Sequence, residues 1–249
     1  MLRQGNGASR LNYFIIYSVK NKVLDRRRLS ELLKGKSLAP VLDYIEVLPP
    51  KKVISPLIKS FYQPEGLERW FAIRAFGKAV AKLADIDMEE ARIVMRRLMW
   101  SLNDESGGIG WGAPEAMAEA MAQNERLASE YARILLSYVW EEGNFLEHLP
   151  LRRGALWGLW RLSETRPEIF QKIEAWRILK DYVNDKDPES KALAILALGH
   201  SNQKWLCDQI ANNLSDRRKL ELFTGDAIEP VSVADAAAKA LHNLSCKDH

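Results

Sequence analysis

One segment decides the fold of this chain: residues 184–199 read NDKDPESKALAILALG. Asp187 is a residue type that caps helix N-termini, and Pro188 suits the first helical position. Ala and Leu then recur at helical spacing, and Gly199 is a typical helix stop. Residues 173–183, just before this segment, form a second amphipathic pattern that ends in a short polar turn. The sequence therefore predicts a helical hairpin here.

The same unit recurs along the chain. Similar Ala- and Leu-rich second helices are predicted at residues 67–77, 114–121, 151–159 and 231–241. One alanine marks the register of each unit, with steps of 41, 39, 39 and 43: Ala75, Ala116, Ala155, Ala194 and Ala237. A period near 40 with two helices per unit is typical of HEAT and armadillo repeats, whose neighbours stack into one core. We predict an all-α fold, a right-handed α-α superhelix of about five HEAT-like helix pairs.

Length and composition are consistent with one repeat array. A chain of 249 residues could hold one domain or two, and the repeat period favours one. A hydrophobic content of 47% excludes a disordered chain. We expect residues 1–20 to be a basic, poorly ordered leader and residues 21–249 to be a single HEAT-like repeat domain.

The sequence also favours a cytoplasmic location. The apolar stretch at residues 13–17 is too short to span a membrane, and no signal-peptide cleavage site follows it. Two cysteines cannot form a disulfide framework, which indicates a reducing compartment. We therefore expect a cytoplasmic protein with no membrane partner.

The Asp-Pro-Glu turn at residues 187–189 and the Ala/Leu-rich second helices resemble HEAT-like repeats of the phycobilisome-lyase type, over residues 38–245. The whole chain, with DESGGIGW at residues 104–111, also resembles an uncharacterised bacterial HEAT-repeat family. These resemblances imply a binding scaffold and no particular reaction, because such repeats serve many functions. No cofactor is implied.

The first departure from the simple repeat is an insertion at residues 103–113. Its four glycines allow positive φ angles and close approach to another surface. No Lys-Ser/Thr follows them, and the acidic side chains around them disfavour phosphate: Asp104, Glu105, Glu115 and Glu119. A cation, a basic side chain or a peptide amine suits this loop better. Alternatively, Glu115 favours the helix start and Trp111 covers the seam between repeats.

We predict a binding patch on the concave face formed by Asp104, Glu105, Gly108, Trp111, Glu115, Arg153 and Trp157. Aromatic and arginine side chains are typical of partner hot spots, although tryptophans such as Trp157 and Trp160 also fill repeat cores. Basic residues recur near the starts of second helices: Arg69, Arg74, Arg152, Arg153 and Lys191. They either pair with acids of the neighbouring repeat or form a basic stripe for nucleic acid.

Charge is unevenly distributed. Residues 1–82 carry 16 Lys/Arg and 6 Asp/Glu, and the remainder carries 20 and 27. Residues 22–34 are predicted to form a basic capping helix, which could also bind nucleic acid. The chain is similar in size and fold to alkylpurine DNA glycosylases built from HEAT-like repeats, with Trp100, Asp104 and Arg153 in a partly matching layout. The acidic remainder disfavours a DNA groove there.

Metal and catalytic motifs are sparse. His200, Cys207, His242 and Cys246 are the notable set, and His242 and Cys246 would share one helix face. Their spacing matches no standard zinc pattern. We therefore predict no metal site, no cofactor and no catalytic residue.

The second insertion spans residues 217–230 and alternates polar and apolar residues before a turn. It predicts a small hairpin, or an ordered loop, that shields the last part of the core.

The function predicted from these features is a non-catalytic helical-repeat scaffold that binds a protein or peptide on its concave face. The alternative is a nucleic-acid-binding protein related to the alkylpurine DNA glycosylases. The basic N-terminal region is the place where we would expect nucleic acid to bind.

Overall fold

The computed structural model of the protein describes residues 23–62, 66–103 and 109–246. Its elements, in chain order, are α2 (Arg26–Leu33), α3 (Ala39–Glu46), α4 (Pro50–Ser60), α5 (Leu67–Ile86), α6 (Met88–Ser101), α7 (Ala113–Gln123), α8 (Glu125–Ser137), α9 (Leu149–Thr165), α10 (Pro167–Lys172), α11 (Trp176–Tyr182), α12 (Pro188–Leu198), the 3-10 helix η2 (Lys204–Leu206), α13 (Cys207–Ala211), β1 (Lys219–Phe223), β2 (Ile228–Ser232) and α14 (Val233–Asn243). The leader at residues 1–20 lies outside the described residues.

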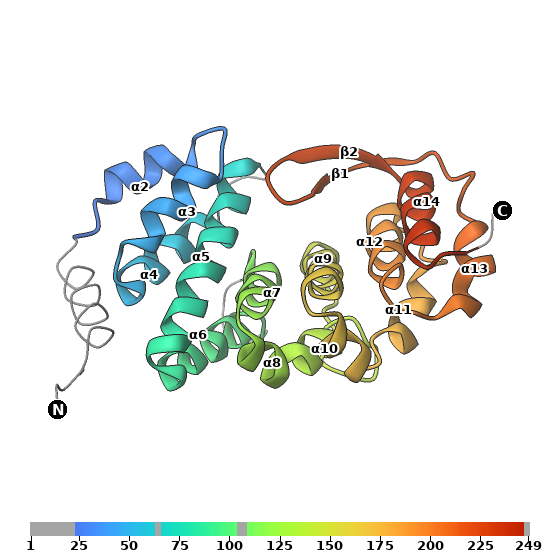
Figure 1. Ribbon diagram of the computed structural model, residues 1–249, viewed down its shortest axis with the longest axis horizontal. Helices are drawn as coiled ribbons and strands as arrows, with labels where there is room; N and C mark the ends of the chain where they lie inside the picture. The colour runs from blue at the N-terminus through green and yellow to red at the C-terminus, as the bar shows by residue number, and fades with distance from the viewer. Residues whose placement is uncertain (1–22, 63–65, 104–108, 247–249) are drawn as a thin grey trace, which may run out of the picture.

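The helices form two layers that curve into an arch (Figure 1). The inner layer consists of α5, α7, α9, α12 and α14, each packed on the next. Their outer partners are α4, α6, α8, the short pair α10 and α11, and α13. The five alanines that mark the repeat register all lie in inner helices and have no exposed surface. The predicted solenoid of five helix pairs is confirmed.

Local sequence sets the helix boundaries. Asp187 begins α12 as predicted, because its carboxylate accepts the N–H of Ser190 at 2.8 Å. Gly199 is the C-cap of the same helix. Ser232 and Asp235 form a reciprocal capping box at the start of α14. The basic helix expected at residues 22–34 is α2, which packs against α3 and α5 and covers the N-terminal end of the array.

Small residues allow the inner helices to pack closely. A methyl group added at Gly158 of α9 would lie 2.7 Å from the Cβ of Ala118 in α7. One added at Gly77 of α5 would lie 2.6 Å from the Cβ of Glu119 in α7. Such distances are too short for two carbon atoms, so these positions require glycine while the helices keep this spacing.

The second insertion forms the predicted hairpin, but its position differs from our expectation. Strands β1 and β2 pair antiparallel, with Leu220 opposite Val231. The hairpin extends from α14 across the concave side of the arch to α5 (Figure 1). At its far end Phe223 stacks on Trp70 of α5, with ring centroids 4.7 Å apart. It therefore bridges the two sides of the arch instead of shielding only the last repeat.

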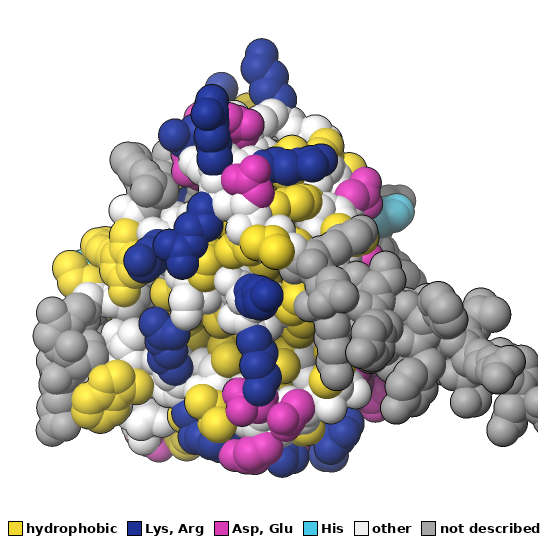
Figure 2. Space-filling view, turned by 90° about the vertical axis from the view of Figure 1, so that its left-hand side faces the viewer, with side chains coloured by type: hydrophobic (Ala, Val, Ile, Leu, Met, Phe, Trp, Pro, Cys, Tyr) yellow, Lys and Arg dark blue, Asp and Glu magenta, His cyan; other side chains and the backbone are white. Residues whose placement is uncertain are grey.

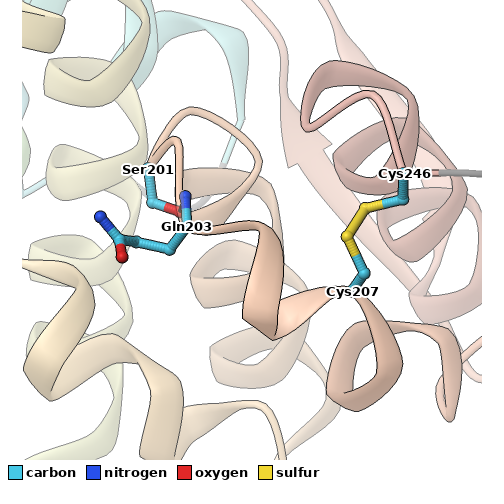
Figure 3. The surroundings of a disulfide bond; sticks show 4 residues. All are labelled: Ser201, Gln203, Cys207 and Cys246. Carbon is cyan, nitrogen blue, oxygen red and sulfur yellow. Dashed lines mark hydrogen bonds between the residues drawn. A yellow bond between two sulfur atoms is a disulfide. The ribbon is translucent and has the colours of Figure 1, made fainter.

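A disulfide joins Cys207, at the start of α13, to Cys246, beyond the end of α14 (Figure 3). Their Cα atoms are 6.0 Å apart, and 39 positions separate them in the chain. The low cysteine count therefore no longer supports a reducing compartment, and the cytoplasmic location stays a prediction without that support. Across the described ranges, no helix has both the length and the apolar character needed to cross a membrane.

Candidate functional site

Ion pairs connect successive inner helices. Arg69 of α5 contacts Glu115 of α7, with Nη2 and Oε1 2.5 Å apart. Deeper in the same interface, Glu119 Oε1 lies 3.1 Å from Arg74 Nη1 of α5 and 2.7 Å from Arg161 Nε of α9. These contacts confirm that basic residues of one repeat pair with acids of the next.

The ladder continues towards the C-terminus. Arg153 of α9 donates from Nε to Asp187 Oδ2 at 3.0 Å and lies 2.9 Å from Glu189 Oε2. Lys191 of α12 lies 3.6 Å from Asp216 Oδ2, just before the hairpin. Four of the predicted basic residues, Arg69, Arg74, Arg153 and Lys191, therefore each pair with a carboxylate.

Arg152 is the exception among the predicted basic residues. Its guanidinium donates to the carbonyl oxygen of Leu146 at 2.9 Å and lies over the ring of Phe145. It secures the loop that precedes α9 and takes no part in the ladder.

Asp187 serves two contacts at once, as the cap of α12 and as the partner of Arg153. Burial alone would raise the pKa of its carboxyl group, but hydrogen bonds from Arg153 and Ser190 hold the pKa below the ordinary value. The carboxylate is therefore ionised at neutral pH and fixes Arg153 in position.

The acidic cluster predicted beside the first insertion is not free for a cation. Glu115 is 3% exposed and Glu119 has no exposed surface, and both are held by arginines. Of the three expected kinds of partner, a basic side chain is the one that the structure shows for these two carboxylates, and it comes from neighbouring inner helices of the chain itself. Asp104, Glu105 and Gly108 lie outside the described residues.

A cavity of about 680 Å³ lies between the hairpin and the N-terminal ends of α5, α7, α9 and α12. Successive inner helices supply its lining: Arg69 and Trp70 from α5, Glu115 from α7, Arg153, Gly154 and Trp157 from α9, and Pro188 and Glu189 from α12. Phe61, Tyr62, Gly66, Trp111 and Pro150 add loop and helix-end surfaces. All five residues of β1 and Ile228 of β2 complete it.

Aromatic contacts hold the hairpin over this cavity. Trp70 and Trp157 lie 4.6 Å apart between ring centroids, and the Phe223 ring is parallel to Trp70 within 5°. The indole N–H of Trp157 donates to the backbone carbonyl of Phe223 at 3.0 Å. The tip of the hairpin is therefore attached by both stacking and a buried hydrogen bond.

Trp111 reaches the cavity from the described end of the first insertion. Gly110 and Gly112 adopt φ angles of 64° and 74°, a region that favours glycine. Gly112 also packs on Phe61, where a Cβ would lie 3.0 Å from the Phe61 Cβ. The half-buried Trp111 ring makes an edge contact with His148, 5.2 Å between centroids. The glycines thus allow the turn that places this ring beside α7.

The structure brings four of the predicted patch residues to one cavity: Trp111, Glu115, Arg153 and Trp157. Trp157 is 4% exposed, so most of its ring belongs to the core, as does the ring of Trp160. Sequence reasoning missed the hairpin strand and Trp70 as parts of this cavity. The alternation in residues 219–223 indicated a strand, but no local pattern indicates which distant helix a hairpin tip will touch.

The cysteines and histidines do not form a metal site. Cys207 and Cys246 are bonded to each other. The expectation that His242 and Cys246 share one helix face is wrong, because α14 ends at Asn243, before Cys246. His200 instead has its ring Nε2 3.3 Å from Asn243 Nδ2. Within the part of the chain that the structure describes, no three His, Cys, Asp or Glu side chains are grouped to hold a metal ion.

The fold and the ladder define a class of protein: a helical repeat solenoid of the armadillo and HEAT kind. An engineered protein of known structure matches with a TM-score of 0.54, 14% identity, 93% of this chain and 96% of that one. A designed armadillo repeat protein matches with a TM-score of 0.51, 16% identity, and 93% and 98% of the two chains. These likenesses establish the fold alone.

Sequence comparison adds one distant relative. An uncharacterized protein of Archaeoglobus fulgidus is 27% identical over 198 residues, which cover 77% of this chain and 94% of that one. No protein-family model matches the chain.

Proposed function

We propose that this protein binds a peptide segment of a partner protein in the cavity between its concave face and the β1–β2 hairpin. The observation that carries the proposal is the cavity itself, because its volume of about 680 Å³ lies in the range of ligand sites. Four successive repeats contribute to its floor, which is the surface that solenoids use for binding.

The lining supports a ligand of mixed character. Tryptophan and arginine, the residue types enriched at binding hot spots, are both present. Charges of the two signs balance, because Arg69, Arg153 and Lys219 line the cavity together with three acids: Glu115, Glu189 and Glu221. A purely basic or purely acidic peptide would face like charges, whereas a peptide with apolar side chains and both signs would not.

The fold supports peptide binding in general terms. A designed armadillo repeat protein described in complex with the peptide (KR)4 matches this chain with a TM-score of 0.53, at 15% identity and over 93% of this chain and 98% of that one. The particular likeness to phycobilisome-lyase repeats and to a bacterial HEAT-repeat family stays a prediction.

Selection from a displayed library of random peptides tests the proposal directly. We expect wild-type protein to enrich peptides that lose about tenfold or more in affinity with Trp111→Ala, since a buried aromatic contact exceeds 1 kcal/mol. Trp100→Ala is the matched control, because Trp100 is 55% exposed and lies outside the cavity lining. No enriched peptide, or equal losses in both variants, would remove the proposal.

A second candidate function is nucleic-acid binding at the N-terminal face. Figure 2 shows Lys and Arg side chains spread over this end of the molecule with apolar side chains between them. The exposed basic residues of α2 and α4 are Arg26, Arg27, Arg28, Lys51, Lys52 and Lys59. Arg27 and Lys51 pair with Glu31 and Glu90.

Fluorescence anisotropy with a short single-stranded RNA at two salt concentrations tests this candidate. If the RNA is bound through its phosphates, the affinity falls steeply as the salt concentration rises. In a plot of log affinity against log salt concentration, the triple variant Arg26→Ala, Arg28→Ala and Lys52→Ala should reduce the magnitude of the slope by up to about three. An unchanged slope would contradict it. A glycosylase-like groove has weaker support, since the inner arginines of the ladder already pair with carboxylates.

A further inference from the structure

The hydrogen-bonding pattern of the hairpin follows from its register. Thr224 N–H donates to the Ala227 carbonyl, and Val233 N–H donates to that of Arg218, so these pairs are hydrogen-bonded across the hairpin. Antiparallel pairs alternate between bonded and non-bonded. In β1, Leu220 and Leu222 therefore bond to β2, whereas Lys219, Glu221 and Phe223 direct their N–H and C=O groups to the opposite edge.

That outer edge of β1 faces the inner helices. Its last carbonyl, on Phe223, accepts the indole N–H of Trp157 in α9 at 3.0 Å. All five β1 residues line the cavity. No hydrogen bond within the described residues reaches the outward N–H and C=O of Glu221. The cavity is therefore bordered on one side by backbone donors and acceptors of a strand edge.

The two edges of the hairpin differ. On β2 the position opposite Glu221 is Pro230, which has no N–H to offer an incoming strand. Proline at an outward position is a common protection against strand addition. The edge of β2 is thus blocked, and the edge of β1 over the cavity is open.

We infer that the bound peptide is extended and adds to β1 as a third strand inside the cavity. The inference rests on the proposed function and specifies its mode of recognition. Main-chain hydrogen bonds to the N–H and C=O of Glu221 and to the N–H of Phe223, whose carbonyl is bonded to Trp157, give affinity that depends little on sequence. Alternate peptide side chains reach the aromatic and charged lining. The partner is a protein with an exposed, unstructured segment of mixed apolar and charged residues.

Two variants at one position test the strand pairing. Glu221→Pro removes the outward N–H, which the hairpin does not use, and Glu221→Ala removes the same side chain but keeps the N–H. With peptides selected on wild-type protein, we expect Glu221→Pro to bind about tenfold more weakly and Glu221→Ala within about threefold of wild type.

Amide hydrogen exchange on wild-type protein is the second measurement, because it needs no altered strand. Saturation with a selected peptide should slow exchange at Glu221 and Phe223 and leave Glu229, on β2, unchanged. If peptides bind in a Trp111-dependent way but bind both Glu221 variants equally, the strand pairing is wrong and the proposed function stands. If no peptide is selected, the proposed function and the strand pairing are both wrong.

Discussion

Glu119 is a charged side chain with no exposed surface, and two arginines from different helices share it. Arg74 of α5 and Arg161 of α9 both contact Oε1, so one carboxylate links three successive inner helices. A buried carboxylate is costly by itself, but removal of one partner from such a group costs more, since it leaves charges unpaired.

Glu119→Gln should therefore destabilise the fold by about 2–4 kcal/mol, because Arg74 and Arg161 lose their shared counter-charge in a mostly buried place. Urea-induced unfolding measures the change. The control is Glu130→Gln, which breaks a more exposed pair with Arg92 and should cost about 1 kcal/mol or less. Equal effects would show that burial of Glu119 carries no extra energy.

The contribution of Asp216, at the base of the hairpin, to the stability of the fold should depend on pH. Hydrogen bonds from Arg218 lower the pKa of its carboxyl group to about 2. A lowered pKa means that the folded state favours the carboxylate, so the stabilisation is complete above the ordinary pKa and is lost as pH falls towards 2. The free-energy difference between wild type and Asp216→Asn should therefore shrink from about pH 5 to about pH 2. Asp226→Asn, which removes one negative charge from the exposed turn of the same hairpin, is the matched variant for comparison.

At the scale of helices, small residues set the spacing of the inner layer. Gly158 of α9 faces Ala118 of α7 at a distance that leaves no room for a methyl group. Elsewhere in a helix, glycine-to-alanine changes stabilise by about 1 kcal/mol because alanine has the better helix propensity. Packing and propensity therefore make opposite predictions at this position.

Gly158→Ala should destabilise the protein by about 1–3 kcal/mol, because the new methyl group overpacks the α7–α9 interface. Denaturant unfolding measures it. The double variant with Ala118→Gly should recover part of the loss, since it returns the volume of one methyl group to the interface. A net gain in stability for Gly158→Ala alone would contradict close contact between these helices.

The sequence contained the repeat but only part of the site. The positions of Ala75 and Ala194 in the inner helices followed from periodicity, because burial repeats with the helix pair. The spacing also left the pairing of Arg69 with an acid of the neighbouring repeat as one of two alternatives, and only the structure identifies Glu115 as its partner. The stacking of Phe223 on Trp70 did not, since it joins residues of different repeats through an insertion that follows no period.

At the scale of the whole molecule, two connections secure the C-terminal end. The hairpin joins α14 to α5 across the concave side, and the disulfide joins Cys207 to Cys246 around the segment that contains the hairpin. The cysteines lie at the start of α13 and just beyond the end of α14, and their separation of 39 positions is close to one repeat. The disulfide therefore fastens the terminal repeat, which has a neighbour on one side only.

Reduction should lower the stability of this end. Loop-closure entropy for a separation of 39 gives an upper value of about 4 kcal/mol. We expect dithiothreitol to lower the urea midpoint and to speed amide exchange in α14 before exchange in α7. The double variant Cys207→Ser and Cys246→Ser serves as the control and should not respond to dithiothreitol. If dithiothreitol leaves the urea midpoint of the wild-type protein unchanged, the disulfide does not stabilise the terminal repeat.

The bridge that the hairpin makes over the concave side also sets how fast a ligand can enter. A short peptide has a free end and can thread beneath β1, so its association rate rises in proportion to its concentration. An internal segment of a folded partner has no free end, so under the proposed function we expect it to enter only after Phe223 leaves Trp70 and Trp157. Its association rate therefore reaches a plateau equal to the rate of that release. Stopped-flow mixing distinguishes the two regimes, and under the proposed function the result separates recognition of chain termini from recognition of loops.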